Sequence, residues 1–298
     1  MNLFIRLITV SLLLLTSSLS VAATVVVTDD SGAQIELEQP AQRIISLAPH
    51  LTELLFAAGA GKQVVATVEY SDYPAEAVKL PRVGSYMAFD LERILALRPD
   101  LVIGWADGNP AVQLERVESL GFPLYRHRPR ALESIPGTLT TLGLLAGTGT
   151  VARQRAELLS ARIAVLKNVA RDSEPTMSFY QVWHQPLMTI GGEQIISDII
   201  TLCGGRNIFA DLSVDAGEVA LEAVLARNPE VIIASGMAAS RPEWLDQWRR
   251  WPQLRAVAEE NLYHVAPDLL QRAGPRLVDG AEQICAIMER VRQRRAAE

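Results

Sequence analysis

Apolar runs alternate with amphipathic stretches along most of the chain, and this alternation predicts strands that are followed by helices. In the first half, strands are expected at residues 43–47, 64–68 and 101–103, and helices at 49–59, 90–96 and 111–120. Strands that are apolar throughout are typical of a parallel sheet with helices on its faces. A β-hairpin with a polar glycine turn is expected to precede them from Thr24. The first half therefore predicts an α/β lobe.

The second half repeats this alternation after a long helical stretch. Residues 150–169 carry apolar side chains at helical spacing, and a helix of twenty residues spans about 30 Å, enough to bridge two lobes. Beyond it, strands are expected at 177–182, 231–233 and 261–265, and helices at 195–203, 221–226 and 275–294. We therefore predict an N-terminal α/β lobe at 24–140, a linking helix at 141–172 and a C-terminal α/β lobe at 173–298.

An internal repeat of thirteen positions relates the two halves. Leu91–Ile103 and Leu221–Ile233 share a leucine–glutamate opening, a helical stretch, a proline and an apolar strand. Two similar α/β lobes joined by one long helix place a ligand cleft between them.

The N-terminal segment 1–23 has the three parts of a secretory signal peptide. Arg6 supplies the positive charge, Leu7–Leu15 the apolar core, and Val21–Ala23 the small residues before a cleavage site. The alternative, a membrane anchor, is disfavoured because the apolar stretch is short. Export predicts a periplasmic location if the source is a double-membrane bacterium.

Composition and charge narrow the class of function. The 298 residues include 28 Lys and Arg against 34 Asp and Glu, a net charge of −6, which argues against binding to nucleic acid. The chain has no nucleophile elbow, phosphate-binding loop, zinc-protease motif or dinucleotide fingerprint. We therefore expect no enzyme, although an exported enzyme that uses His184 with a carboxylate stays open.

The two cysteines, Cys203 and Cys285, predict one disulfide, because an even number in an exported protein favours pairing. The alternative is two buried free thiols. A metal site is not favoured, since the four histidines are scattered and no close Cys/His spacing occurs.

Aromatic residues fall in the loops at the ends of predicted strands. Tyr70 and Tyr86 lie in two such loops, and Trp105 and Trp183 follow one strand in each half. Ligands of open α/β sheets bind beyond the carboxyl ends of the strands, and large rigid rings there suit a bulky, flat or apolar ligand. The alternative for each ring is packing against its own loop.

Charged residues near the same loops have two interpretations each. Asp268 and Arg272 follow the last predicted strand and either bind the polar rim of a ligand or pair with each other. Arginines at 126, 128 and 130 form either a solvated edge or a binding place for an anion.

Glu92 and Glu222 occupy equivalent positions of the internal repeat. Each begins a predicted helix, where a carboxylate stabilises the helix dipole. Their symmetric placement suggests instead two matched docking points for a symmetric partner.

The chain resembles periplasmic solute-binding proteins of the cobalamin and iron-siderophore class. The resemblance runs from Arg43 to about Arg290. It is carried by residues 45–49, 52–54, 70–74, 91–94, 99–103, 203–205, 207–209 and 272–276.

The resemblance implies two lobes joined by one long helix, with little closure on binding, and capture of cobalamin or a related corrinoid for an ABC importer. It implies that the ligand is held by Tyr70, Tyr86, Trp105, Asp268 and Arg272, that Glu92 and Glu222 meet the two permease subunits, and that Cys203 pairs with Cys285. We expect a monomer that carries the corrinoid as cargo and holds no cofactor or metal.

Trp183 and His184 depart from the family pattern, and this indicates a pocket rebuilt around Trp183. A haem or a ferric siderophore stays open as the ligand. Haem would use a Tyr or His axial ligand such as Tyr70, Tyr86 or His184, and a siderophore would use the arginines.

Overall fold

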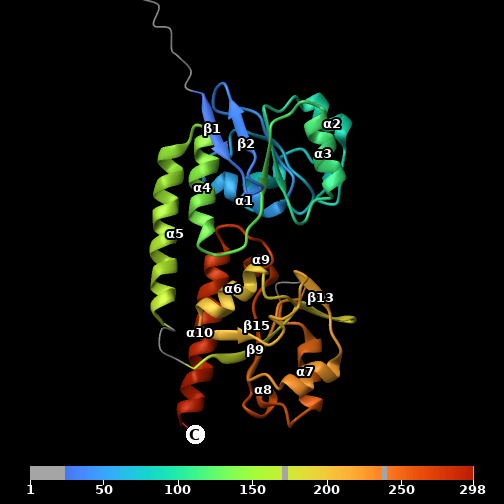
Figure 1. Cartoon of the computed structure of the whole chain (residues 1–298), viewed down its shortest axis with the longest axis vertical. Helices are drawn as coiled ribbons and strands as arrows, with labels where there is room; N and C mark the ends of the chain where they lie inside the picture. Colours follow the sequence, from blue (N-terminus) through green and yellow to red (C-terminus); the bar gives the residue numbers. More distant parts are fainter. Residues whose placement is uncertain (1–23, 170–173, 237–239, 298) are drawn as a thin grey trace, which may run out of the picture.

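Two parallel sheets of four strands each, one per lobe, form the framework of the protein in a computed structural model (Figure 1). The structure describes residues 24–169, 174–236 and 240–297, so the predicted signal peptide at 1–23 lies outside the described residues. None of the helices that the structure describes combines the length and the apolar character that a membrane span needs.

The elements of the first half follow the predicted order, with additional short strands and two helices that were not predicted there, at 75–79 and 134–145. They are β1 (Val25–Thr28), β2 (Gln34–Leu37), β3 (Ile44–Ser46), α1 (Pro49–Ala57), β4 (Val64–Ala66), the 3-10 helix η1 (Ala75–Lys79), β5 (Gly84–Ser85), β6 (Ala88–Phe89), α2 (Leu91–Leu97), β7 (Leu101–Trp105), α3 (Ala111–Ser119), β8 (Leu124–His127) and α4 (Ser134–Leu145). The predicted hairpin after Thr24 is formed by β1 and β2, which pair antiparallel.

The second half begins with a long helix of 21 residues. Its elements are α5 (Gly149–Val169), β9 (Thr176–Gln181), β10 (Trp183–His184), β11 (Leu187–Ile190), α6 (Ile195–Leu202), β12 (Gly205–Asn207), β13 (Ala216–Glu218), α7 (Leu221–Arg227), β14 (Val231–Ala234), the 3-10 helix η2 (Glu243–Arg250), α8 (Arg255–Ala258), β15 (Leu262–His264), α9 (Pro267–Leu270) and α10 (Leu277–Ala297).

The internal repeat is visible in the topology of the two sheets. The N-lobe sheet has the order β4-β3-β7-β8 and the C-lobe sheet the order β12-β9-β14-β15, so the second, first, third and fourth strands lie side by side in both. The repeated helices also end alike, since Arg98 after α2 and Asn228 after α7 both adopt the left-handed conformation, with φ of 46° and 43°. Each helix is therefore connected to the third strand of its sheet through the same backbone conformation.

The segment 141–172 differs from the single linking helix that we predicted. Its described residues, 141–169, contain the end of α4, a turn and α5. Gly147 allows the turn because it adopts a φ of 72°, which glycine tolerates better than other residues. Figure 1 shows α5 beside α4 along the N-lobe and reaching down to α10 of the C-lobe. The long helix thus contacts both lobes.

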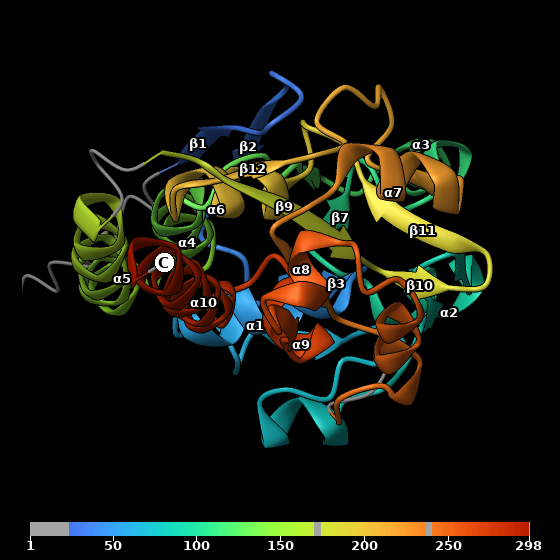
Figure 2. The same ribbon diagram turned by 90° about the horizontal axis from the view of Figure 1, so that it is seen from below.

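One continuous hydrophobic cluster joins the lobes. Buried side chains of α1, α4, α5, α6 and α10 belong to the same cluster, which Figure 2 shows as helices gathered at one side of the molecule. The other face of each sheet has a separate cluster of its own. Because packed interiors resist deformation, this shared core favours a fixed arrangement of the lobes.

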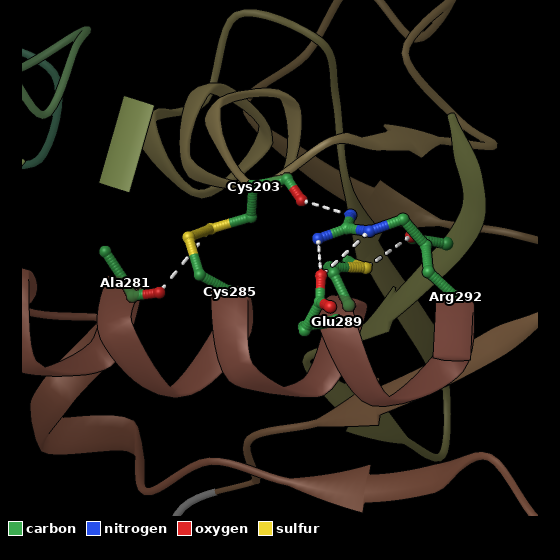
Figure 3. The surroundings of a disulfide bond; sticks show 7 residues. Cys203, Ala281, Cys285, Glu289 and Arg292 are labelled. Atoms are coloured by element: carbon green, nitrogen blue, oxygen red, sulfur yellow. Dashed lines mark hydrogen bonds and ion pairs between the residues drawn. A yellow bond between two sulfur atoms is a disulfide. The ribbon is translucent and has the colours of Figure 1, made fainter. Parts of the chain in front are cut away.

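The predicted disulfide is confirmed. Cys203, at the end of α6, is bonded to Cys285 of α10, and their Cα atoms lie 4.6 Å apart. Figure 3 shows Arg292 beside this bond, where its guanidinium donates to the Cys203 carbonyl oxygen at 2.9 Å and to Glu289 at 2.9 Å. The disulfide and the arginine together hold α6 on the closing helix.

A small antiparallel sheet, β10-β11-β13, was not expected from the sequence. Its strands have two to four residues, and two of them, β10 and β13, lack the apolar runs that predicted the parallel strands. Figure 1 shows β13 at the edge of the C-lobe that faces the N-lobe. Trp183 and His184 form β10, which pairs with β11 at the far side of this sheet from β13.

Candidate functional site

Trp105 is the last residue of β7, at the carboxyl end of the N-lobe sheet. Its backbone N–H donates to the side-chain oxygen of Asn109 at 2.6 Å. The amide nitrogen of Asn109 donates to the carbonyl oxygens of Leu47 at 3.0 Å and of Tyr86 at 2.8 Å. Asn109, which the sequence analysis did not single out, therefore ties three loops together at one buried side chain.

The rings of Tyr86 and Trp105 lie close together, with centroids 6.1 Å apart and planes inclined by 41°. Tyr86 sits between the two short strands β5 and β6 and is 36% exposed. The structure thus brings these two predicted site residues together as one aromatic surface of the N-lobe.

Two buried histidines lie near Trp105, and no sequence motif marks them. The ring of His50 meets that of Trp105 edge-on at 5.1 Å and lies 5.7 Å from the ring of His127. Burial lowers the pKa of His50 well below its usual value of 6.5, and the charges of His127 and Arg272 lower it further. His50 is therefore neutral at pH 7.

Asp30, from the hairpin turn, fixes His127 from the other side. The Nδ1 nitrogen of His127 donates to the Asp30 carboxylate at 2.9 Å. Burial acts to raise the pKa of Asp30, but the hydrogen bonds from His127 and from the Arg128 backbone outweigh it, so the pKa is lowered. The hairpin thus anchors the end of β8.

Tyr70 lies apart from this aromatic pair. It follows β4, is 69% exposed, and has a φ of 62°, in the left-handed region that tyrosine rarely adopts. An exposed ring on such a backbone is available to a ligand, but no ring contact joins Tyr70 to Trp105 in the described part of the chain.

Trp183 and His184 form a second aromatic group on the C-lobe. Their ring centroids lie 5.0 Å apart, and the His184 ring stacks on Trp244 of η2 at 5.4 Å with planes inclined by only 11°. The indole N–H of Trp183 donates to the Gln185 carbonyl oxygen at 2.9 Å. The indole N–H of Trp183 is therefore satisfied within its own hairpin.

Asp268 and Arg272 form the ion pair that the sequence left open, with Nη2 of Arg272 3.2 Å from the Asp268 carboxylate. Arg272 also contacts Asp72, across the boundary between the lobes, and Glu53 of α1 at 3.4 Å. Its hydrogen bond to Asp72 lowers the pKa of that carboxyl group. Arg272 is thus part of an ionic network between the lobes.

The arginines after β8 are paired with carboxylates. Arg126 pairs with Glu118, Arg128 with Asp107, and Arg130 with both Asp107 and Asp215. These pairs neutralise much of the positive charge that an anionic ligand would need.

A cavity of about 460 Å³ lies next to Arg130, where the N-lobe meets the start of α6. It is lined by Arg130, Gly192, Glu193, Ser197, Asp198 and Thr201. None of the aromatic residues described above lines it. Across the described ranges, histidine, cysteine and carboxylate side chains do not form a group of three or more that could hold a metal ion.

Glu92 and Glu222 are both exposed, in the first turns of α2 and α7. Within the described residues, neither carboxylate takes part in an ion pair. Figure 1 shows α2 and α7 on the same side of the molecule, one in each lobe.

Comparison with known proteins supports the resemblance that the sequence showed. Residues 44–269 match the model of the periplasmic binding protein family. The vitamin B12-binding protein of Vibrio cholerae is 37% identical over 251 residues, which cover 84% of this chain and 90% of the relative. That of Yersinia pestis is 38% identical over 250 residues, which cover 84% and 87%.

A solved structure agrees with this relationship. The crystal structure of the periplasmic vitamin B12-binding protein of Vibrio cholerae superposes with a TM-score of 0.79 at 36% identity, covering 85% of this chain and 98% of that one. The two-lobed α/β fold that we predicted is thereby confirmed. The chain belongs to the periplasmic binding protein family.

Proposed function

We propose that this protein is the solute-binding component of an ABC importer, which captures cobalamin or a related corrinoid in the periplasm. The observation that carries the proposal is the pair of aromatic groups, Tyr86 with Trp105 on the N-lobe and Trp183 with His184 on the C-lobe. Such rings suit the broad apolar faces of a macrocycle. Relatives named vitamin B12-binding proteins, 37% and 38% identical over 84% of the chain, support the choice of ligand.

Preorganisation supports tight binding by this site. Asn109 fixes the backbones of Trp105 and Tyr86, and the shared hydrophobic cluster resists movement of the lobes. A site that is already ordered loses little conformational entropy when the ligand binds. Tyr70, Asp268 and Arg272 complete the proposed ligand contacts. The corrinoid is cargo, so no reaction and no resident cofactor are involved.

Delivery to the permease is proposed to use Glu92 and Glu222. The two carboxylates are exposed and lie in equivalent helices of the two lobes. A permease dimer with one basic site in each subunit would meet them in a matched way. In this proposal the protein is a monomer, exported through the segment 1–23 and active at the inner membrane.

Calorimetric titration of the ligand-free mature protein with cyanocobalamin tests the proposal. We expect one-to-one binding with a submicromolar Kd. Haemin and a ferric siderophore are titrated in parallel. Saturation by either of these, with no heat from cyanocobalamin, would move the ligand assignment away from corrinoids while leaving the transport role.

A further inference from the structure

His184 has an open ring nitrogen beside the proposed ligand site. Within the described residues no hydrogen bond reaches this side chain: Nδ1 is buried without a partner, whereas Nε2 keeps contact with solvent. The ring is nevertheless held in place by its stacking on Trp244 at 5.4 Å. The side chain is therefore ordered by aromatic contacts and has a nitrogen available to a ligand.

The hairpin that carries His184 is also fixed in position. His184 pairs with Leu187 across β10 and β11, and β11 pairs with β13. The guanidinium of Arg130, from the N-lobe, contacts the Glu193 carbonyl oxygen and the Asp215 carboxylate, which flank β11 and β13. The sheet that presents His184 is thus tied to the opposite lobe.

The other two histidines near the site also have a buried nitrogen without a partner, Nε2 in each case, but their rings are closed off from solvent. His50 and His127 are 4% and 1% exposed, and Nδ1 of His127 is bonded to Asp30. Both rings are therefore buried in the N-lobe, whereas His184 is only half-buried. His184 is better placed to bind the centre of a flat ligand.

We propose that Nε2 of His184 coordinates the cobalt of a bound corrinoid at its upper axial position, so that the protein selects corrinoids whose upper ligand exchanges. This inference rests on the proposed function and specifies which chemical form of the corrinoid the protein prefers. Imidazole is a good ligand for transition metals, and it binds through the nitrogen that does not carry the proton.

The proposed step is a ligand exchange without a change of oxidation state. In aquacobalamin, the lone pair of Nε2 forms a bond to Co(III) as the bond from cobalt to the water oxygen breaks, and the water leaves. The imidazole proton stays on Nδ1. In cyanocobalamin the cyanide is held too strongly to be displaced, so this ligand binds through the macrocycle alone.

Absorption spectroscopy of the bound corrinoid tests the inference. Ligand-free protein is titrated with aquacobalamin and, as the matched control, with cyanocobalamin. We expect the spectrum of aquacobalamin to change to that of an imidazole-ligated corrinoid, whereas that of cyanocobalamin keeps its form. We also expect aquacobalamin to bind at least about tenfold more tightly, a ratio that corresponds to one added interaction of moderate strength.

The variants His184→Ala and His184→Gly identify the ligand. Both should lose the spectral change and the preference for aquacobalamin, and free imidazole should restore the spectral change in His184→Gly. A wild-type protein that binds cyanocobalamin but leaves the aquacobalamin spectrum unchanged would overturn the inference and leave the proposed function intact. A spectral change that persists in His184→Ala would also overturn it. If neither corrinoid binds, the proposed function itself fails.

Discussion

The carboxylate of Glu53, in α1 of the N-lobe, accepts two hydrogen bonds from the guanidinium of Arg276, which immediately precedes α10, at 2.7 and 2.9 Å. Glu53 is 3% exposed, so this bidentate pair is buried at the boundary between the lobes. Arg276 also lies over the ring of Tyr73, with its guanidinium carbon 4.1 Å from the ring centroid. The pair connects the two lobes next to the loops that hold the proposed ligand.

Glu53→Ala should lower the free energy of unfolding by about 3–5 kcal/mol, because it leaves Arg276 and Arg272 without the carboxylate that compensates their partial burial. Urea unfolding of the ligand-free protein measures the change. Arg162→Ala is the matched control, since it breaks more exposed pairs, those from α5 to Asp279 and Glu282 of α10. That control should cost no more than about 1 kcal/mol. Equal effects of the two substitutions would contradict the importance of the buried pair.

Acidification should destabilise the protein through His50, whose pKa in the folded state is held well below 6.5 by burial and by the charges of His127 and Arg272. In the unfolded chain His50 becomes protonated near pH 6.5, whereas in the folded protein it stays neutral to a lower pH. The folded state is therefore most stable, with respect to this group, above pH 6.5, and it loses stability as the pH falls below that value. The slope is at most about 1.4 kcal/mol per pH unit for one proton.

His50→Gln should remove this slope between pH 6.5 and pH 5, as measured by urea unfolding at a series of pH values. Asp30 and Asp72 also have lowered pKa values, but their usual value is 3.8, so they act at lower pH and do not obscure the window. An unchanged slope in His50→Gln would assign the acid sensitivity to another group.

Much of the fold could be predicted from the sequence because the parallel strands are buried on both faces. Runs such as Leu101–Trp105 and Val231–Ala234 are apolar throughout, and the helices before them have clear ends at positions 98 and 228. The sheet β10-β11-β13 could not be predicted, because β10 and β13 have no apolar run and β13 pairs with β11 from a distant part of the chain.

The candidate site was predictable only as a set of aromatic residues at strand ends. The sequence placed Trp105 and Trp183 there, since ligands bind beyond the carboxyl ends of strands. The roles of Asn109, His50 and Glu53 depend on contacts between loops far apart in the chain, such as the bond from Asn109 to Leu47. No motif marks such residues, so three-dimensional structure is needed to find them.

Removing the disulfide should destabilise the protein markedly. Cys203 and Cys285 are 82 positions apart. Closing a loop of that length lowers the conformational entropy of the unfolded chain, which stabilises the folded state by about 4 kcal/mol. The double variant Cys203→Ala/Cys285→Ala should lose about that amount in urea unfolding. Arg292 still joins the end of α6 to α10 in this variant, so the native fold should persist. The control is reductant, which should destabilise the wild type but leave the double variant unchanged.

Glu92→Lys/Glu222→Lys should abolish delivery to the permease without weakening ligand binding. Both residues are exposed on α2 and α7 and have no ion-pair partner among the described residues, so the substitutions should leave the lobes folded. Cobalamin uptake into permease-containing proteoliposomes measures delivery, and calorimetry measures binding. The control is Glu115→Lys/Glu243→Lys, which reverses two other exposed carboxylates. Normal uptake with the first double variant would reject the docking role.

Trp105→Ala should weaken cobalamin binding by about 1–3 kcal/mol, which is roughly 5-fold to 150-fold in Kd, because it removes the ring at the end of β7 that faces Tyr86. Trp105→Phe should recover part of the loss, since it keeps an aromatic face of smaller area. Trp251→Ala is the matched control: this tryptophan packs on Trp248 in the hydrophobic cluster of the C-lobe, with ring centroids 5.6 Å apart. It should lower stability and leave the Kd unchanged. If Trp105→Ala binds cobalamin as tightly as the wild type, the N-lobe aromatic pair is not part of the ligand site.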